Sequence, residues 1–170
     1  MAWALVNPMD EELAHALAAL TTGIYVLTVR DGDRVHGMSS SWVTQVSGEP
    51  PLIMAAVDHR HFTHGIIDAT GRFALNVVGR GGKQLEDYFY SPASRRPDNL
   101  EGMAWEPSAH GQPLLREAMM CLDCQVVARF AAGDHTLFVA AVEQVVRRNT
   151  DRALTSQDLD YVYVGRVIKR

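Results

Sequence analysis

The chain has 170 residues, of which 47% are hydrophobic and 21% charged, and its formal net charge at pH 7 is −4. These values are typical of a soluble globular protein, and we expect a single domain over residues 1–170. The negative balance disfavours a nucleic-acid binder that neutralises phosphates, and no apolar run approaches the roughly 20 residues of a membrane span.

The amino terminus and the cysteines both indicate a cytoplasmic protein. The segment MAWALVNPMDEEL has no basic start and turns acidic at once, unlike a secretory signal peptide. Cys121 and Cys124 form a lone C-x-x-C in a segment that reads as a strand, where residues three apart point to opposite faces. We therefore predict two reduced, structural thiols, without a disulfide or a zinc site.

The chain opens with a predicted helix and a β-hairpin. Leucines recur at helical spacing over residues 10–20, and we expect this amphipathic helix to cover one mouth of a β-core. Residues 24–29 are β-branched and aromatic enough for a strand. The sequence Asp-Gly-Asp at 31–33 is typical of a hairpin turn, which leads to a second strand over 34–38.

The next stretch, HGMSSSWVTQVSGEPPL at residues 36–52, is too polar to be explained by packing alone. Trp42 supplies a flat apolar surface, and two prolines end the stretch in an extended conformation. Small hydroxyls come from Ser39, Ser40, Ser41 and Ser47. This combination suits a planar, anionic ligand such as a flavin nucleotide. Composition alone leaves open an ordinary strand–loop–strand with a serine-rich turn.

Three histidines follow a short apolar run at 52–57 that predicts a buried strand. His59, His61 and His64 have the spacing i, i+2, i+5, and no acidic ligand is placed by pattern, so we expect no metal site. A helix is predicted over residues 61–69, and its first backbone amides would favour an anion.

The remaining chain predicts one more helix, four more strands and a long loop. The strands are expected at 73–78, 119–130, 135–146 and 160–166, and the helix at 83–90. Asn76 lies in so apolar a run that, if buried, its amide must find hydrogen-bond partners. Residues 91–113 are rich in proline and charge, and we interpret them as a long irregular loop, of the kind that is usually either functional or disordered.

The overall pattern predicts a mainly antiparallel β-barrel with short flanking helices. About seven short strands are expected, and no β–helix–β unit repeats, which excludes a doubly wound parallel sheet. A Rossmann G-x-G-x-x-G fingerprint is also absent from the sequence.

The polar stretch resembles the signature of the flavin reductase-like family, the FMN-binding split-barrel flavoproteins, which reads approximately G-M-T/S-A-S-W-V-T-Q-V-S-x-x-P-P-L. The matching positions are Gly37, Met38, Ser39, Ser41, Trp42, Val43, Thr44, Gln45, Val46, Ser47, Pro50, Pro51 and Leu52. Further similarity at 21–23, 73–76, 133–135 and 161–165 follows in the expected order. The resemblance therefore spans nearly the whole chain.

The resemblance implies a Greek-key split β-barrel that pairs as a homodimer. It also implies an NAD(P)H-dependent flavin reductase, with NADH or NADPH as the electron donor and FMN, or FAD, as the acceptor. Reduced flavin would then pass to a partner monooxygenase.

The resemblance further implies roles for individual residues. His135, in a Gly-Asp-His triplet, would act at the nicotinamide side of the flavin. Arg60 and Thr63 would hold the phosphate, and Asn76 would support the ring. The residues expected around the ring and ribityl chain, together with the rest of the cofactor-binding set, are Met38, Ser39, Ser40, Ser41, Trp42 and Ser47.

Two departures from the family pattern keep alternatives open. His61 replaces the family's serine, and Ala140-Ala141-Val142 replaces its G-E-V, which takes a customary neighbour from His135. These changes are compatible with a flavin-binding electron-transfer protein that does not oxidise nicotinamide. The three clustered histidines leave open a split barrel that binds another planar ligand, such as haem.

Overall fold

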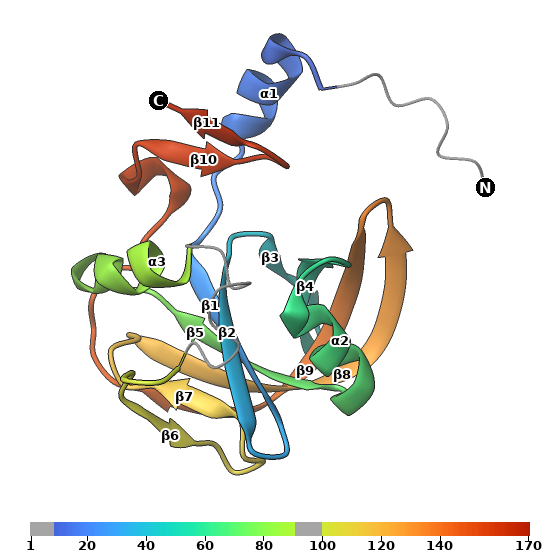
Figure 1. The fold of residues 1–170 in the computed structure, drawn as a ribbon, viewed down its shortest axis with the longest axis vertical. Helices are drawn as coiled ribbons and strands as arrows, with labels where there is room; N and C mark the ends of the chain where they lie inside the picture. Colours follow the sequence, from blue (N-terminus) through green and yellow to red (C-terminus); the bar gives the residue numbers. More distant parts are fainter. Residues whose placement is uncertain (1–8, 91–99) are drawn as a thin grey trace.

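The computed structural model describes residues 9–90 and 100–170, and a seven-stranded antiparallel sheet forms its centre (Figure 1). The strand order is β2-β1-β5-β8-β9-β4-β3. The strands of this sheet are β1 (Tyr25–Asp31), β2 (Arg34–Ser40), β3 (Val43–Gly48), β4 (Pro51–Asp58), β5 (Arg72–Val77), β8 (Met120–Ala132) and β9 (His135–Arg147). The predicted antiparallel β-fold is thus confirmed.

The sheet must curl into a split barrel because its two edge strands are consecutive in the chain. β2 ends at Ser40 and β3 begins at Val43, so only Ser41 and Trp42 connect opposite edges of the sheet. Such a connection spans at most roughly 10 Å. The backbone amide of Ala56 in β4 also donates to the Trp42 carbonyl, at 2.9 Å, which holds the connection against the sheet.

Both long hairpins form where the sequence predicts them. β1 and β2 are joined by a two-residue turn in which Gly32 takes a φ of 59°, a value that favours glycine. β8 and β9 pair from Ala132 opposite His135 outward, around Gly133 and Asp134. The polar stretch is more regular than expected, because β2 continues to Ser40 and Val43–Gly48 forms an edge strand.

The α-helices of the described chain are α1 (Glu11–Ala18), α2 (Phe62–Thr70) and α3 (Lys83–Phe89). None of these is long and apolar enough to cross a membrane. α1 begins after Asp10, whose carboxylate accepts from the Leu13 amide at 2.8 Å. It does not cover a mouth of the barrel as predicted: Ala14 and Ala18 pack on the carboxyl-terminal segment, and Figure 1 shows α1 beside β10 and β11.

The carboxyl-terminal segment differs from the single strand expected at 160–166. It forms a small hairpin of β10 (Tyr161–Tyr163) and β11 (Val167–Lys169). Gly165 turns the chain between them with a φ of 97°. A short 3₁₀ helix, Ser156–Asp158, precedes the hairpin.

The predicted irregular loop at 91–113 contains regular structure in its second part. Residues 91–99 lie outside the described residues. Beyond them, β6 (Trp105–Pro107) pairs with β7 (Pro113–Leu115). Two of the prolines that suggested an irregular loop, Pro107 and Pro113, stand at the ends of these strands, where a missing amide is tolerated.

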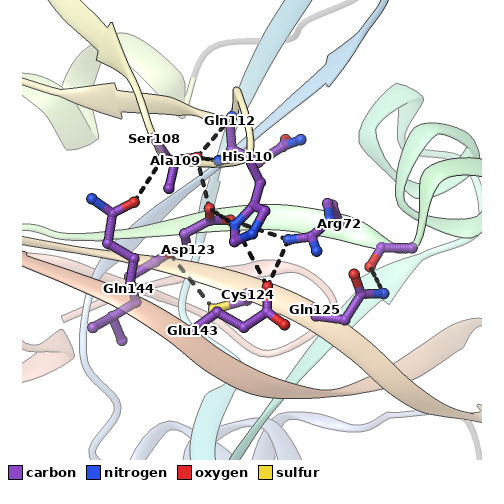
Figure 2. A network of polar contacts seen from close by, with 12 residues as sticks. Arg72, Ser108, Ala109, His110, Gln112, Asp123, Cys124, Gln125, Glu143 and Gln144 are labelled. Carbon is purple, nitrogen blue, oxygen red and sulfur yellow. Dashed lines mark hydrogen bonds and ion pairs between the residues drawn. The ribbon is translucent and has the colours of Figure 1, made fainter.

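A polar network fastens the β6–β7 hairpin to the barrel (Figure 2). Buried Asp123 of β8 accepts from Ser108 Oγ at 2.7 Å and from His110 Nδ1 at 2.8 Å. The Arg72 guanidinium lies 4.0 Å from the second oxygen of the same carboxylate. The amide of Ala109 donates to the Gln144 side chain at 2.8 Å.

The two cysteines lie in different parts of the core. Cys121 belongs to the apolar cluster under α3 and β7, and Cys124 to the cluster that contains Phe73 and Phe138. Both are free thiols, as predicted. Burial raises the pKa of both, that of Cys124 to about 12, so both stay protonated and unreactive at neutral pH.

Candidate functional site

A pocket of about 280 Å³ lies where the chain crosses from β2 to β3. Its walls come from the end of β2, the connection to β3, α3, the start of β9 and the carboxyl-terminal segment. Six predicted site residues line it together: Met38, Ser39, Ser40, Ser41, Trp42 and His135. Residues nearly one hundred positions apart in the chain are therefore brought to one cavity by barrel closure.

Aromatic rings form one wall of the pocket. The Trp42 indole lies 4.7 Å from the His135 imidazole and 5.7 Å from the Tyr163 ring, measured between centroids. Both pairs are tilted by 40°. Such a wall offers flat apolar surface to a planar ligand.

His135 is held in one orientation by its neighbour. Its Nδ1 lies 2.6 Å from Asp134 Oδ1, and this hydrogen bond lowers the pKa of Asp134. The ionised carboxylate can only accept, so Nδ1 carries the proton and Nε2 is left for a ligand. Across the β4–β9 ladder His135 stands opposite Asp58, which also lines the pocket.

Arg60 is engaged by Asp58 and is absent from the pocket wall. Its Nη2 lies 2.6 Å from Asp58 Oδ2, and its backbone amide donates to Oδ1 at 2.8 Å. The hydrogen bonds from Arg60 hold the pKa of Asp58 well below its usual range. The Arg60 side chain is 80% exposed, so it can still reach an anion at the rim.

The start of α2 combines groups that fit an anion. His61 occupies the N-cap position, makes no side-chain capping bond and lines the pocket. Thr63 is fully buried, and within the described chain its hydroxyl has no hydrogen-bond partner. Burial lowers the pKa of His61, which favours its neutral form. The first amides of a helix are donors that a phosphate could use, and His61 brings this helix start to the pocket, whereas Thr63 does not line it.

The other two histidines of the cluster are turned away from the pocket wall. Nε2 of His59 and Nε2 of His64 lie 3.2 Å and 2.9 Å from the Thr136 hydroxyl. Neither ring lines the pocket. Of the three histidines that left haem open as a ligand, only His61 therefore lines the pocket.

Besides Arg60 and Thr63, two further predicted cofactor-binding residues, Ser47 and Asn76, do not line the pocket. Ser47 stands opposite Leu52 on the edge strand β3. Buried Asn76 donates to the Val26 carbonyl at 3.0 Å and to Thr28 Oγ1 at 2.9 Å, and it accepts from the Leu115 amide at 2.8 Å. It has the partners that burial requires, and its contact with a flavin stays a prediction.

Sequence reasoning missed Glu86, which is 3% exposed and lines the pocket from α3. It accepts hydrogen bonds from Ser39 Oγ and from the Tyr161 hydroxyl, the latter at 2.9 Å. A signal was present: Glu86, Phe89 and Tyr90 have the spacing i, i+3, i+4 of one helix face. Tyr161 and Tyr163 were also missed, because the pocket position of β10 depends on tertiary structure.

The Ala140-Ala141 departure lies far from His135. Both alanines are in the middle of β9, five and six residues further along the strand, which corresponds to about 17 Å or more. Ala140 is fully buried opposite Ile53. A glutamate in this part of β9 would not contact His135, so the expected loss of a neighbour is not supported.

Comparison with known proteins decides the family, since the family model of the flavin reductase like domain matches residues 17–168. The chain belongs to this family. The NADH-dependent flavin reductase of a Rhodococcus species is 34% identical over 82% of this chain and 77% of that protein. HsaB of Mycobacterium tuberculosis, the reductase subunit of a flavin-dependent monooxygenase, is 31% identical over 76% of this chain and 67% of its own length.

The fold agrees with solved structures of flavin reductases. The NADH:FAD oxidoreductase SgcE6 of Streptomyces globisporus superposes with a TM-score of 0.77 at 26% identity, covering 91% of this chain and 88% of that one. The chain also matches diflavin flavoproteins of Nostoc and Synechocystis species, of whose length it spans about a quarter, 23% and 24%. The flavin reductase-like split barrel is therefore the shared unit.

Proposed function

We propose that this protein is an NAD(P)H-dependent flavin reductase that binds FMN, or FAD, in the pocket between β2 and α3. The observation that carries the proposal is the meeting of Ser39, Ser40, Ser41, Trp42 and His135 in one cavity. Relatives that are named as NADH-dependent flavin reductases and reductase subunits support the same activity.

The residues of the pocket suit the parts of a flavin nucleotide. Trp42 and Tyr163 offer flat surface for the ring, and serine hydroxyls from the end of β2 can bond to polar atoms of the ring and ribityl chain. The start of α2, where His61 lines the pocket and Thr63 and Arg60 lie beside it, suits the phosphate. This donor set fits the cofactor.

The role of the protein is to bind, orient and exclude water. Bound flavin would supply the acceptor for a hydride from the nicotinamide, so the chain needs no nucleophile of its own. His135 keeps Nε2 available beside Trp42 for a polar group of the nicotinamide, since Asp134 holds Nδ1. Packing of the two rings positions the ligand so that the reacting atoms can meet.

Anaerobic reduction of added FMN by the purified protein tests this proposal. We expect NADH or NADPH to bleach the flavin's visible absorbance catalytically, and a dithionite control shows that the bound flavin is reducible. Protein that binds flavin but bleaches with neither nucleotide would contradict hydride transfer and favour the electron-transfer alternative. The similarity to diflavin flavoproteins is compatible with this electron-transfer alternative.

We further propose that the protein forms a homodimer and passes reduced flavin to a partner monooxygenase in the cytoplasm. Large apolar side chains on the β8–β9 hairpin support a second copy as a neighbour: Val127, Phe130 and Val145 are each more than half exposed. The reductase-subunit relative supports the monooxygenase partner. Free thiols and a nicotinamide donor are consistent with the reducing cytoplasm.

A further inference from the structure

Glu86 is a buried acid without a cationic partner. Among residues 9–90 and 100–170 no ion pair involves it, and the nearby Lys83 pairs instead with Asp87 at 2.6 Å. Its carboxylate is satisfied by two hydroxyls, those of Ser39 from β2 and Tyr161 from β10. Desolvation by burial raises the pKa of Glu86, although both hydrogen bonds act in the opposite direction. Burying an acid is costly, so this arrangement calls for an explanation beyond packing.

The two hydrogen bonds determine which way the hydroxyls face. Ser39 Oγ donates to one carboxylate oxygen of Glu86 and the Tyr161 hydroxyl donates to the other, so each hydroxyl directs its single proton to Glu86. Their remaining lone pairs are then available to the pocket, which all three residues line. Two residues that could either donate or accept therefore become acceptors.

A ligand group that lies against the wall formed by Ser39, Tyr161 and Glu86 must offer a hydrogen-bond donor to the two hydroxyls. A phosphate brings only acceptor oxygens and negative charge, and a carboxylate in a low-dielectric pocket repels it. Opposite in chemical character is the uncapped start of α2, where His61 lines the pocket and the first backbone amides of the helix can donate. The pocket thus has an acceptor side and a donor side.

We propose that Glu86 is a positioning residue that makes Ser39 and Tyr161 accept from an N–H or O–H group of the uncharged part of a flavin, and that keeps the phosphate away from this wall. The inference rests on the proposed function, because it requires a flavin in the pocket. Glu86 would act through the two hydroxyls and would determine the direction in which the flavin enters.

The test compares the dissociation constants of FMN and riboflavin, measured by fluorescence titration without nicotinamide. In Glu86→Gln the new amide donates, so one hydroxyl must accept from it and turn its own proton to the pocket. We expect affinity for both flavins to fall about tenfold, with the ratio of the two constants unchanged. Asp87→Asn is the matched control, because it removes the same charge from an exposed position on the same helix and should leave both constants unchanged.

A double-mutant cycle separates positioning from a structural effect. In a Ser39→Ala, Tyr161→Phe background, Glu86→Gln should weaken binding no further, since the hydroxyls through which it acts are gone. Additive losses would overturn the inference, as would wild-type affinity in Glu86→Gln or a change confined to FMN.

Two further outcomes keep the test decisive. If Glu86→Gln does not fold, Ser39→Ala and Tyr161→Phe alone should weaken FMN and riboflavin by equal factors, and unchanged affinity in both would overturn the inference. If the wild-type protein binds neither flavin, the proposed function fails and the inference falls with it. Flavin binding that is indifferent to Glu86 overturns the inference alone.

Discussion

Asn76 and Glu86 are buried polar residues that solve the same physical problem in different places. Asn76 finds its partners inside the barrel, in the backbones of β1 and β7 and in Thr28. Glu86 finds its partners at the pocket surface, in hydroxyls that a ligand can also reach. The location of the partners, more than the residue type, separates a structural role from a role in binding.

The Asn76 amide is therefore expected to matter for stability. Asn76→Leu leaves the Leu115 amide and the Val26 carbonyl without their bonds, and we expect the free energy of unfolding to fall by about 2–4 kcal/mol. Chemical denaturation measures this loss. Asn149→Leu, at an exposed position, is the control and should cost much less. A tenfold loss of FMN affinity in folded Asn76→Leu would instead support the predicted contact with flavin.

The β6–β7 hairpin is an element whose position depends on one buried acid. Asp123 is 1% exposed and joins Ser108 and His110 of the hairpin to the barrel strands (Figure 2). Glu143 contacts the same network from its exposed side, with Oε2 2.9 Å from Arg72 Nη1. The two acids thus offer a comparison between buried and exposed ion pairing in one cluster.

Removing the buried acid should release the hairpin. Asp123→Ala leaves the partners of a buried carboxylate without their hydrogen bonds, and we expect the free energy of unfolding to fall by about 3 kcal/mol. Hydrogen exchange at the amides of Ala109 and Gln112 should accelerate, since the contacts that hold this turn are lost. Glu143→Ala is the control, because an exposed pair contributes less than about 1 kcal/mol. Equal losses in the two variants would argue against this view of the network.

At the scale of the whole molecule, the β8–β9 hairpin carries large apolar side chains that are exposed to solvent. Phe130 is 58% exposed and Val127 is 55% exposed, three residues apart in β8. Apolar surface of this kind is favourable to bury against another protein. The second copy proposed above would provide that burial.

The oligomeric state can be measured by light scattering after size-exclusion chromatography. We expect a dimer for the wild type and at least a tenfold weaker dimer for Phe130→Glu, because a charge would be buried in an apolar contact. Leu20→Glu places the same charge at another exposed apolar position, 63% exposed near α1, and should leave the dimer intact. A wild-type monomer, or a Phe130→Glu dimer of unchanged affinity, would refute the proposed interface.

The sequence alone determined the two long hairpins, the segment that carries Ser39 to Trp42, and most strands of the main sheet, namely β1, β2, β4, β5, β8 and β9. These features depend on local periodicity, on turn residues such as Gly32 and on the polarity of one short stretch, all of which can be read along the chain. The same local patterns predicted free thiols at Cys121 and Cys124. The antiparallel fold class follows from them as well.

Only the tertiary structure decided which residues face the pocket and which partners they have. The closure of the sheet brings His135 to Trp42, and the carboxyl-terminal hairpin brings Tyr161 to Glu86. Tertiary packing also places α1 against that hairpin. It likewise provides the Asn76 amide with hydrogen-bond partners inside the barrel. Periodicity reports whether a side chain is buried, whereas the identity of its neighbour depends on long-range packing between segments that the local sequence does not encode.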